Sequence, residues 1–78
     1  MTREECEQKI VVLLSKVNDV YREYSPEGQY LNLMVDKDYI HGFNNPHRED
    51  TKKPIDFCAE RKEGEKSWAL TTFPVQGG

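Results

Sequence analysis

The sequence lacks the clustered chemical groups on which metal sites, phosphate-binding loops and nucleophilic active sites depend. It contains two cysteines and two histidines, none of them in a paired spacing, whereas a structural zinc site needs about four ligands. The five glycines are scattered along the chain, so no glycine-rich phosphate loop is formed. We therefore predict no catalytic residue, no metal and no small-molecule cofactor, and we expect that the chain is not an enzyme.

Long apolar runs and an excess of one charge are also absent. No apolar run reaches the roughly 18 residues of a membrane span, and the N-terminus is not a basic segment followed by an apolar one. These absences predict a cytoplasmic chain without membrane contact, in which both thiols stay reduced. The 11 basic and 14 acidic residues are mixed in every region, so the charge pattern does not favour nucleic acid as a partner.

What the sequence does contain is one long helical pattern between Glu5 and Tyr24. Apolar residues recur there at steps of three and four, and Val11 and Val12 make the apolar arc wider than a lone surface helix needs. Thr2 and Glu5 have the spacing of a capping box, and a nearby proline ends the helix close to Tyr24. The apolar stripe consists of Cys6, Ile10, Leu13, Leu14, Val17, Val20, Tyr21 and Tyr24.

After the helix the apolar period changes from 3.6 to 2, which indicates β-strands. Alternating runs at 30–35 and 39–44 flank a short polar break and predict a hairpin. Its register stays open, because a shift by one residue moves every side chain to the other face. A three-residue loop would place the aromatic residues of the second strand on the face of Leu33. A two-residue loop would gather five side chains on the opposite face: Tyr30, Met34, Tyr39, His41 and Phe43.

A second hairpin is predicted from the alternating runs at 55–60 and 67–73, with a turn at 62–65. If residues 63–64 form its loop, Ala59 lies opposite Trp68 and Phe57 lies opposite Leu70. One helix and two hairpins predict an α+β fold of order αββββ, with the N-terminal amphipathic helix packed on one face of a four-stranded antiparallel sheet. The sheet residues expected to contact the helix are Leu31, Leu33, Val35, Ile40, Ile55, Phe57, Trp68 and Leu70.

The chain is predicted to form a single small domain, residues 1–78, because its length supports one core. Residues 44–54 combine turn-forming residues with mixed charge and predict an exposed loop. Residues 74–78 are expected to be a frayed tail.

The candidate binding residues are Tyr30, Tyr39, His41 and Phe43, which share one sheet face in the two-residue register. In the other register these aromatic side chains would belong to the core. An uncovered aromatic face suits contact with another protein. Our main hypothesis is therefore a small, non-enzymatic, cytoplasmic binding protein that engages a protein partner or itself, as a homo-oligomer, through the sheet face.

Two other functions were weighed on the same residues. Single-stranded nucleic acid could stack its bases on the aromatic face, but Asp36 and Asp38 lie beside it and few basic residues are near. A thiol or metal enzyme would have to use Cys58 or His47. Asp56 and Glu60 share a strand face with Cys58, and their charge opposes thiolate formation.

Overall fold

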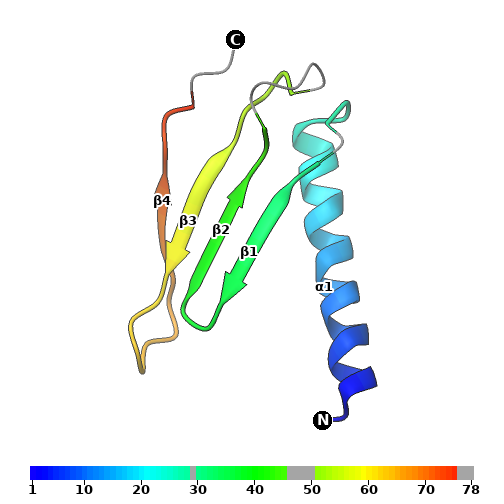
Figure 1. Ribbon diagram of the computed structural model, residues 1–78, viewed down its shortest axis with the longest axis vertical. Coiled ribbons are helices and arrows are strands. Elements are labelled where there is room, and N and C mark those ends of the chain that lie inside the picture. The colour runs from blue at the N-terminus through cyan, green and yellow to red at the C-terminus, as the bar shows by residue number, and fades with distance from the viewer. Residues whose placement is uncertain (29, 46–50, 76–78) are drawn as a thin grey trace.

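The computed structural model describes residues 1–28, 30–45 and 51–75. One helix, α1 (Arg3–Tyr24), is followed by four strands, β1 (Asn32–Asp36), β2 (Tyr39–Phe43), β3 (Asp56–Glu60) and β4 (Ala69–Thr72). The strands form one antiparallel sheet in the order β1-β2-β3-β4, and the helix lies on the β1 side of it (Figure 1). The predicted α+β fold class and the order of elements are confirmed.

Helix α1 begins and ends as its sequence predicts. The Thr2 side chain accepts a hydrogen bond from the Glu5 amide, and Glu4 and Glu5 place negative charge in the first turn, where the helix dipole is positive. At the other end the Ser25 amide donates to the Tyr21 carbonyl before Pro26 stops the ladder. The 22-residue helix is therefore a rod about 33 Å long.

The first hairpin adopts the two-residue loop. Leu33 pairs with Gly42 and Val35 pairs with Ile40, so the alternative register, with the aromatic residues in the core, does not occur. We call the face that points toward α1 the inner face and the other the outer face. The inner face carries Leu33, Val35, Ile40, Gly42, Phe57, Ala59, Leu70 and Thr72.

The register predicted for the second hairpin was wrong by two residues. Phe57 pairs with Thr72 and Ala59 pairs with Leu70, so the same side chains share a face but with different partners. The difference in register arises in the connection between β3 and β4. There the Arg61 amide donates to the Asp38 carbonyl at 3.0 Å, and the guanidinium carbon of Arg61 lies 4.8 Å from the centre of the Trp68 ring. These contacts hold Trp68 outside the strand ladder, and β4 begins at Ala69.

A buried polar cluster around Tyr21 and Asn44 joins the C-terminal end of the helix to the sheet. The Tyr21 hydroxyl donates to the Tyr30 carbonyl at 3.2 Å and accepts from the Asn44 amide at 3.3 Å. Asn44 also donates to the Lys53 carbonyl at 3.0 Å and accepts from the Ile55 amide at 2.9 Å. Because each polar atom is satisfied, the burial of this cluster fixes the position of the helix end without leaving an unpaired group.

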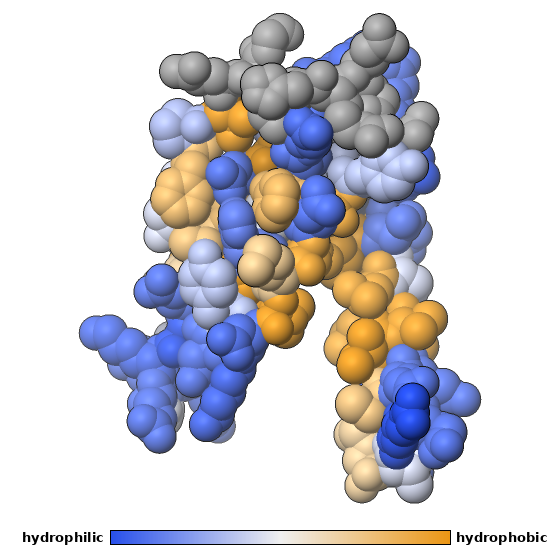
Figure 2. Space-filling model, viewed as in Figure 1, coloured by the Kyte–Doolittle hydropathy of each residue, from blue (hydrophilic) through white to orange (hydrophobic). Residues whose placement is uncertain are grey.

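Away from that cluster the helix covers much less of the sheet than the sequence predicts. In Figures 1 and 2, α1 is close to the sheet at its C-terminal end and diverges from it toward its N-terminus. Among the described residues, the buried hydrophobic side chains are Tyr21 and Cys58. Val35 and Leu70, which were expected to contact the helix, remain 75 % and 67 % exposed.

The predicted exposed loop 44–54 differs from expectation at its start. Asn44 is only 2 % exposed, because its side chain forms the hydrogen bonds described above. Residues 46–50 of this loop lie outside the described residues, as do residues 76–78 of the predicted tail. Of the other tail residues, Pro74 is exposed and Val75 is half-buried.

Candidate functional site

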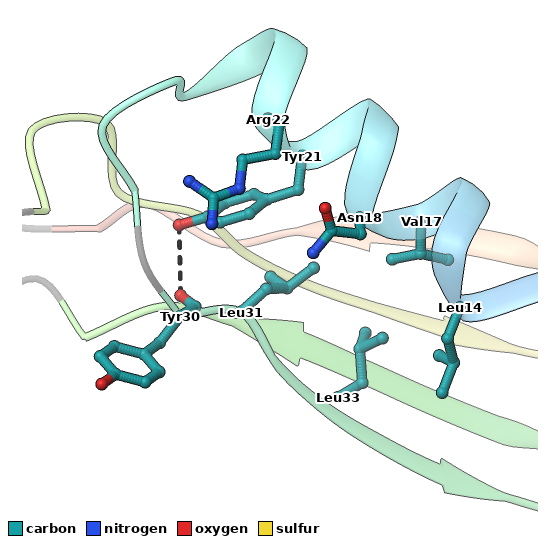
Figure 3. A pocket seen from close by; sticks show the side chains of 8 residues that line it. All are labelled: Leu14, Val17, Asn18, Tyr21, Arg22, Tyr30, Leu31 and Leu33. Atoms are coloured by element: carbon teal, nitrogen blue, oxygen red, sulfur yellow. Dashed lines mark hydrogen bonds between the residues drawn. The ribbon is translucent and has the colours of Figure 1, made fainter. Parts of the chain in front are cut away.

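A cleft lies between helix α1 and the inner face of the sheet. At its closed end, Leu14 and Val17 of the helix face Leu31 and Leu33 across a hollow of about 230 Å³ (Figure 3). Tyr21 closes that end through its hydrogen bond to the Tyr30 carbonyl. Toward the helix N-terminus the two walls separate, so the cleft opens to solvent (Figure 2).

The cleft is lined mainly by apolar residues, together with the polar Asn18 and Arg22 of the helix. Elsewhere on the helix, outside this hollow, Leu13 is 60 % and Val20 is 68 % exposed. On the sheet, the inner face of the four strands carries no charged side chain, and Thr72 is its one polar residue. Contiguous apolar surface of this kind marks a contact site for another macromolecule, because water is excluded from it at a gain in free energy.

A cross-strand contact shapes the middle of the inner face. Gly42 lies beside the ring of Phe57, and a Cβ at position 42 would approach Phe57 Cε1 to 2.6 Å and Leu33 Cδ2 to 3.1 Å. The glycine therefore lets the aromatic ring lie across β2. Phe57 also borders a hollow that it shares with Leu70 and Thr72 of the same face.

Of the four residues singled out from the sequence, Tyr39, His41 and Phe43 lie elsewhere, on the outer face. Tyr39, His41 and Phe43 form a row along β2, with ring centroids 6.4 Å and 4.8 Å apart. The ring of Tyr30 points away from the helix (Figure 3) and is 55 % exposed. The structure thus places Tyr39, His41 and Phe43 on the outer face, whereas Tyr30 precedes β1 and is one of the residues that line the cleft.

Acidic groups surround this aromatic row. His41 Nε2 is 2.8 Å from Asp56 Oδ1, and Asp36 and Glu60 flank Tyr39 in the sheet register. Desolvation raises the pKa of Tyr39 above its ordinary 10.0, and the neighbouring Cys58 thiol adds to the effect. Phosphate groups of a nucleic acid would be repelled by this arrangement.

The thiols and carboxylates are placed as follows. Both cysteines are free, Cys6 exposed and Cys58 buried. In the part of the chain that the structure describes, no three histidine, cysteine, aspartate or glutamate side chains are grouped so as to hold a metal ion. Nor does any helix among the described residues combine the length and apolar character needed to cross a bilayer.

Comparison with protein families, curated proteins and solved structures finds no match to this chain. The function is therefore argued from the geometry of the two sheet faces.

Sequence reasoning missed the cleft because it assigned every inner-face residue to a closed core. The signal that could have found it was the width of the helical stripe. Val11 and Val12 extend the apolar surface of α1 beyond the side that meets the sheet, and they remain 64 % and 55 % exposed. A helix that is apolar around half its circumference needs a second partner in addition to its own sheet.

Proposed function

We propose that this chain is a small, non-enzymatic binding protein that engages another protein through the cleft between α1 and the inner sheet face. The observation that carries the proposal is the exposed apolar surface on the two elements that flank the cleft, with Leu13 on the helix and Val35 and Leu70 on the inner sheet face. A cytoplasmic location is part of the same proposal.

The position of the binding surface differs from the sequence-based hypothesis, which placed it on the aromatic row. The row contains fewer fully exposed side chains, since Tyr39 is 36 % exposed and His41 and Phe43 are half-buried. Its polar contacts are also made within the chain, as between His41 and Asp56. The inner face carries no such internal polar pairs, which favours it as the surface that a partner covers.

Single-stranded nucleic acid stays as the second hypothesis on the outer face. Aromatic stacking alone would favour it, by about 1–3 kcal/mol per base, but Asp36, Asp56 and Glu60 share that face. No observation favours nucleic acid over a protein as the partner.

The test compares two adjacent positions of β1 that point to opposite faces. A photo-crosslinking amino acid is placed at Val35, on the inner face, or at Met34, on the outer face; both are exposed, at 75 % and 58 %. In cells that produce the protein we expect a protein adduct from position 35 and none from position 34. An adduct from position 35 with this same chain or with a different protein supports the proposal.

Two results would contradict it. Adducts from position 34 alone would move the binding site to the outer face, and nucleic acid in those adducts would establish the second hypothesis. The absence of any protein adduct from position 35, with the crosslinker shown to be present and the chain folded, would remove the cleft as a binding site.

A further inference from the structure

The amount of exposed surface says how large the missing partner is. A folded monomer of 9.1 kDa is expected to expose about 4,900 Å², whereas this chain exposes 6592 Å². Its radius of gyration is 14.3 Å, and about 11.5 Å is expected for a compact chain of this length. The excess of about 1,700 Å² per chain is an upper bound on the area that a partner could cover. For two copies that bound is about 3,400 Å², which lies in the range of obligate homodimers.

The spacing of the exposed apolar residues of α1 indicates which kind of secondary-structure element can pack against the helix. Cys6, Ile10, Leu13, Val17, Val20 and Tyr24 follow one another at steps of four and three. That alternation is the seam of two helices packed side by side. Of these residues, Val17 also lines the closed end of the cleft, together with Leu14 and Tyr21. The N-terminal part of the seam, at Cys6, Ile10 and Leu13, lies outside that hollow and is available to a second helix. In the described part of this chain α1 is the only helix.

We infer that the occupant of the cleft is a second copy of this chain, whose helix α1 lies antiparallel to the first and contacts the inner sheet face of its partner. This inference rests on the proposed function and names its partner. In a pair related by a twofold axis, each copy packs its apolar helix against the cleft of the other copy, so the helix and the inner sheet face of both copies are covered. The net charge of −3 per chain opposes such pairing only weakly.

The antiparallel direction follows from the shape of the cleft and from charge. The cleft is closed at the Tyr21 end and open at the helix N-terminus, as Figures 2 and 3 show. Each helix therefore enters with its N-terminal half, and a twofold axis makes the two halves run in opposite directions near Ile10. Antiparallel packing also separates the two acidic first turns, Glu4 and Glu5, which a parallel pair would bring together.

The first experiment measures mass by sedimentation equilibrium of the purified full chain over a range of concentrations. We expect twice the 9.1 kDa of one chain. Val35→Glu should weaken association at least tenfold, because it places a charge on the covered inner face. Met34→Glu, the neighbour on the outer face, should leave the association constant within twofold of the wild type.

The substituted side chains are exposed in the single chain, at 75 % for Val35 and 58 % for Met34, so neither change disturbs its own contacts. A monomer at every concentration would overturn the inference. So would a mass that Met34→Glu reduces and Val35→Glu does not, since the copies would then meet through their outer faces.

A second measurement, disulfide crosslinking, tests the helix direction and does not depend on Val35→Glu folding correctly. In the antiparallel pair, Leu13→Cys lies near Cys6 of the other copy and should form a covalent dimer on mild oxidation. Within one helix these positions are about 10.5 Å apart, which is too far for a disulfide. The crosslink should disappear when Cys6→Ser is added.

The outcomes separate the inference from the proposed function. Efficient crosslinking of the wild-type chain through Cys6 would indicate parallel helices, and a dimer in which Leu13→Cys forms no crosslink would place the helices elsewhere; both overturn the inference. The chain could be a monomer in solution and still give an adduct with a different protein from position 35. That result would overturn the inference that the partner is a second copy, but it would support the proposed binding function. A monomer with no such adduct defeats both.

Discussion

At the scale of single residues, the position of the helix depends on Asn44 more than on any hydrophobic side chain. It is only 2 % exposed and connects Tyr21, Lys53 and Ile55 through its amide group. Two segments that are distant in sequence, the end of α1 at Tyr21 and residues 53–55, therefore meet at the Asn44 side chain. Satisfied buried polar groups of this kind specify one arrangement, because any other leaves a donor or acceptor unpaired.

We predict that Asn44→Ala lowers the free energy of unfolding by about 1–3 kcal/mol, because it leaves the Ile55 amide and the Lys53 carbonyl without their partner. Urea unfolding at fixed protein concentration measures the change. Asn32→Ala, on the exposed start of β1, is the control and should alter stability by about 0.5 kcal/mol or less. Equal effects of the two substitutions would show that the buried cluster does not anchor the helix.

At the scale of elements, the contact between Arg61 and Trp68 decides how β3 and β4 pair. The Arg61 guanidinium donates to Asp38 at 3.1 Å and lies over the indole ring. The tip of the first hairpin is thereby linked to the connection of the second. Arginine suits this position because its planar group can stack and donate hydrogen bonds at the same time.

Arg61→Ala should expose Trp68 further, shift its fluorescence emission to longer wavelength and destabilise the chain by about 1 kcal/mol. Arg61→Lys keeps the charge but not the planar stack, so its emission should resemble that of Arg61→Ala. Lys62→Ala, at the exposed neighbouring position, should change neither quantity. An emission spectrum that is the same in all four proteins would mean that the ring contact has no part in holding Trp68.

The same elements show which parts of the fold can be predicted from the sequence. The helix bounds and the division of strands followed from local rules, since the Thr2 cap and the alternating strands act over a few residues. The pairing of β3 with β4 did not follow from local rules, because β4 begins only at Ala69 and the connection is longer than the two-residue loop that the sequence predicts. For the candidate site, alternation placed Tyr39, His41 and Phe43 on one face but left open whether that face was core or surface, because the register of the hairpin stayed undecided. The open cleft depends on how far α1 diverges from the sheet, which no local pattern encodes.

At the scale of the whole molecule, few hydrophobic side chains of the described residues are buried within one chain. Ordering one residue costs about 1–2 kcal/mol in backbone entropy, and burial of apolar surface is the main term that offsets this cost. Here Tyr21 and Cys58 are the buried hydrophobic residues of the described chain. Folding and association should therefore be a single process, as in obligate dimers.

This coupling predicts that the unfolding midpoint rises with protein concentration. For a dimer that unfolds to two separate chains, each tenfold increase in concentration adds about 1.4 kcal/mol to the stability of the folded dimer. Thermal unfolding followed by circular dichroism at several concentrations measures the shift, and Val35→Glu should lower the midpoint at each of them. Met34→Glu supplies the matched control. A midpoint that is independent of concentration would show that each chain folds alone. The single chain would then be stable in water with the apolar surface of its cleft exposed.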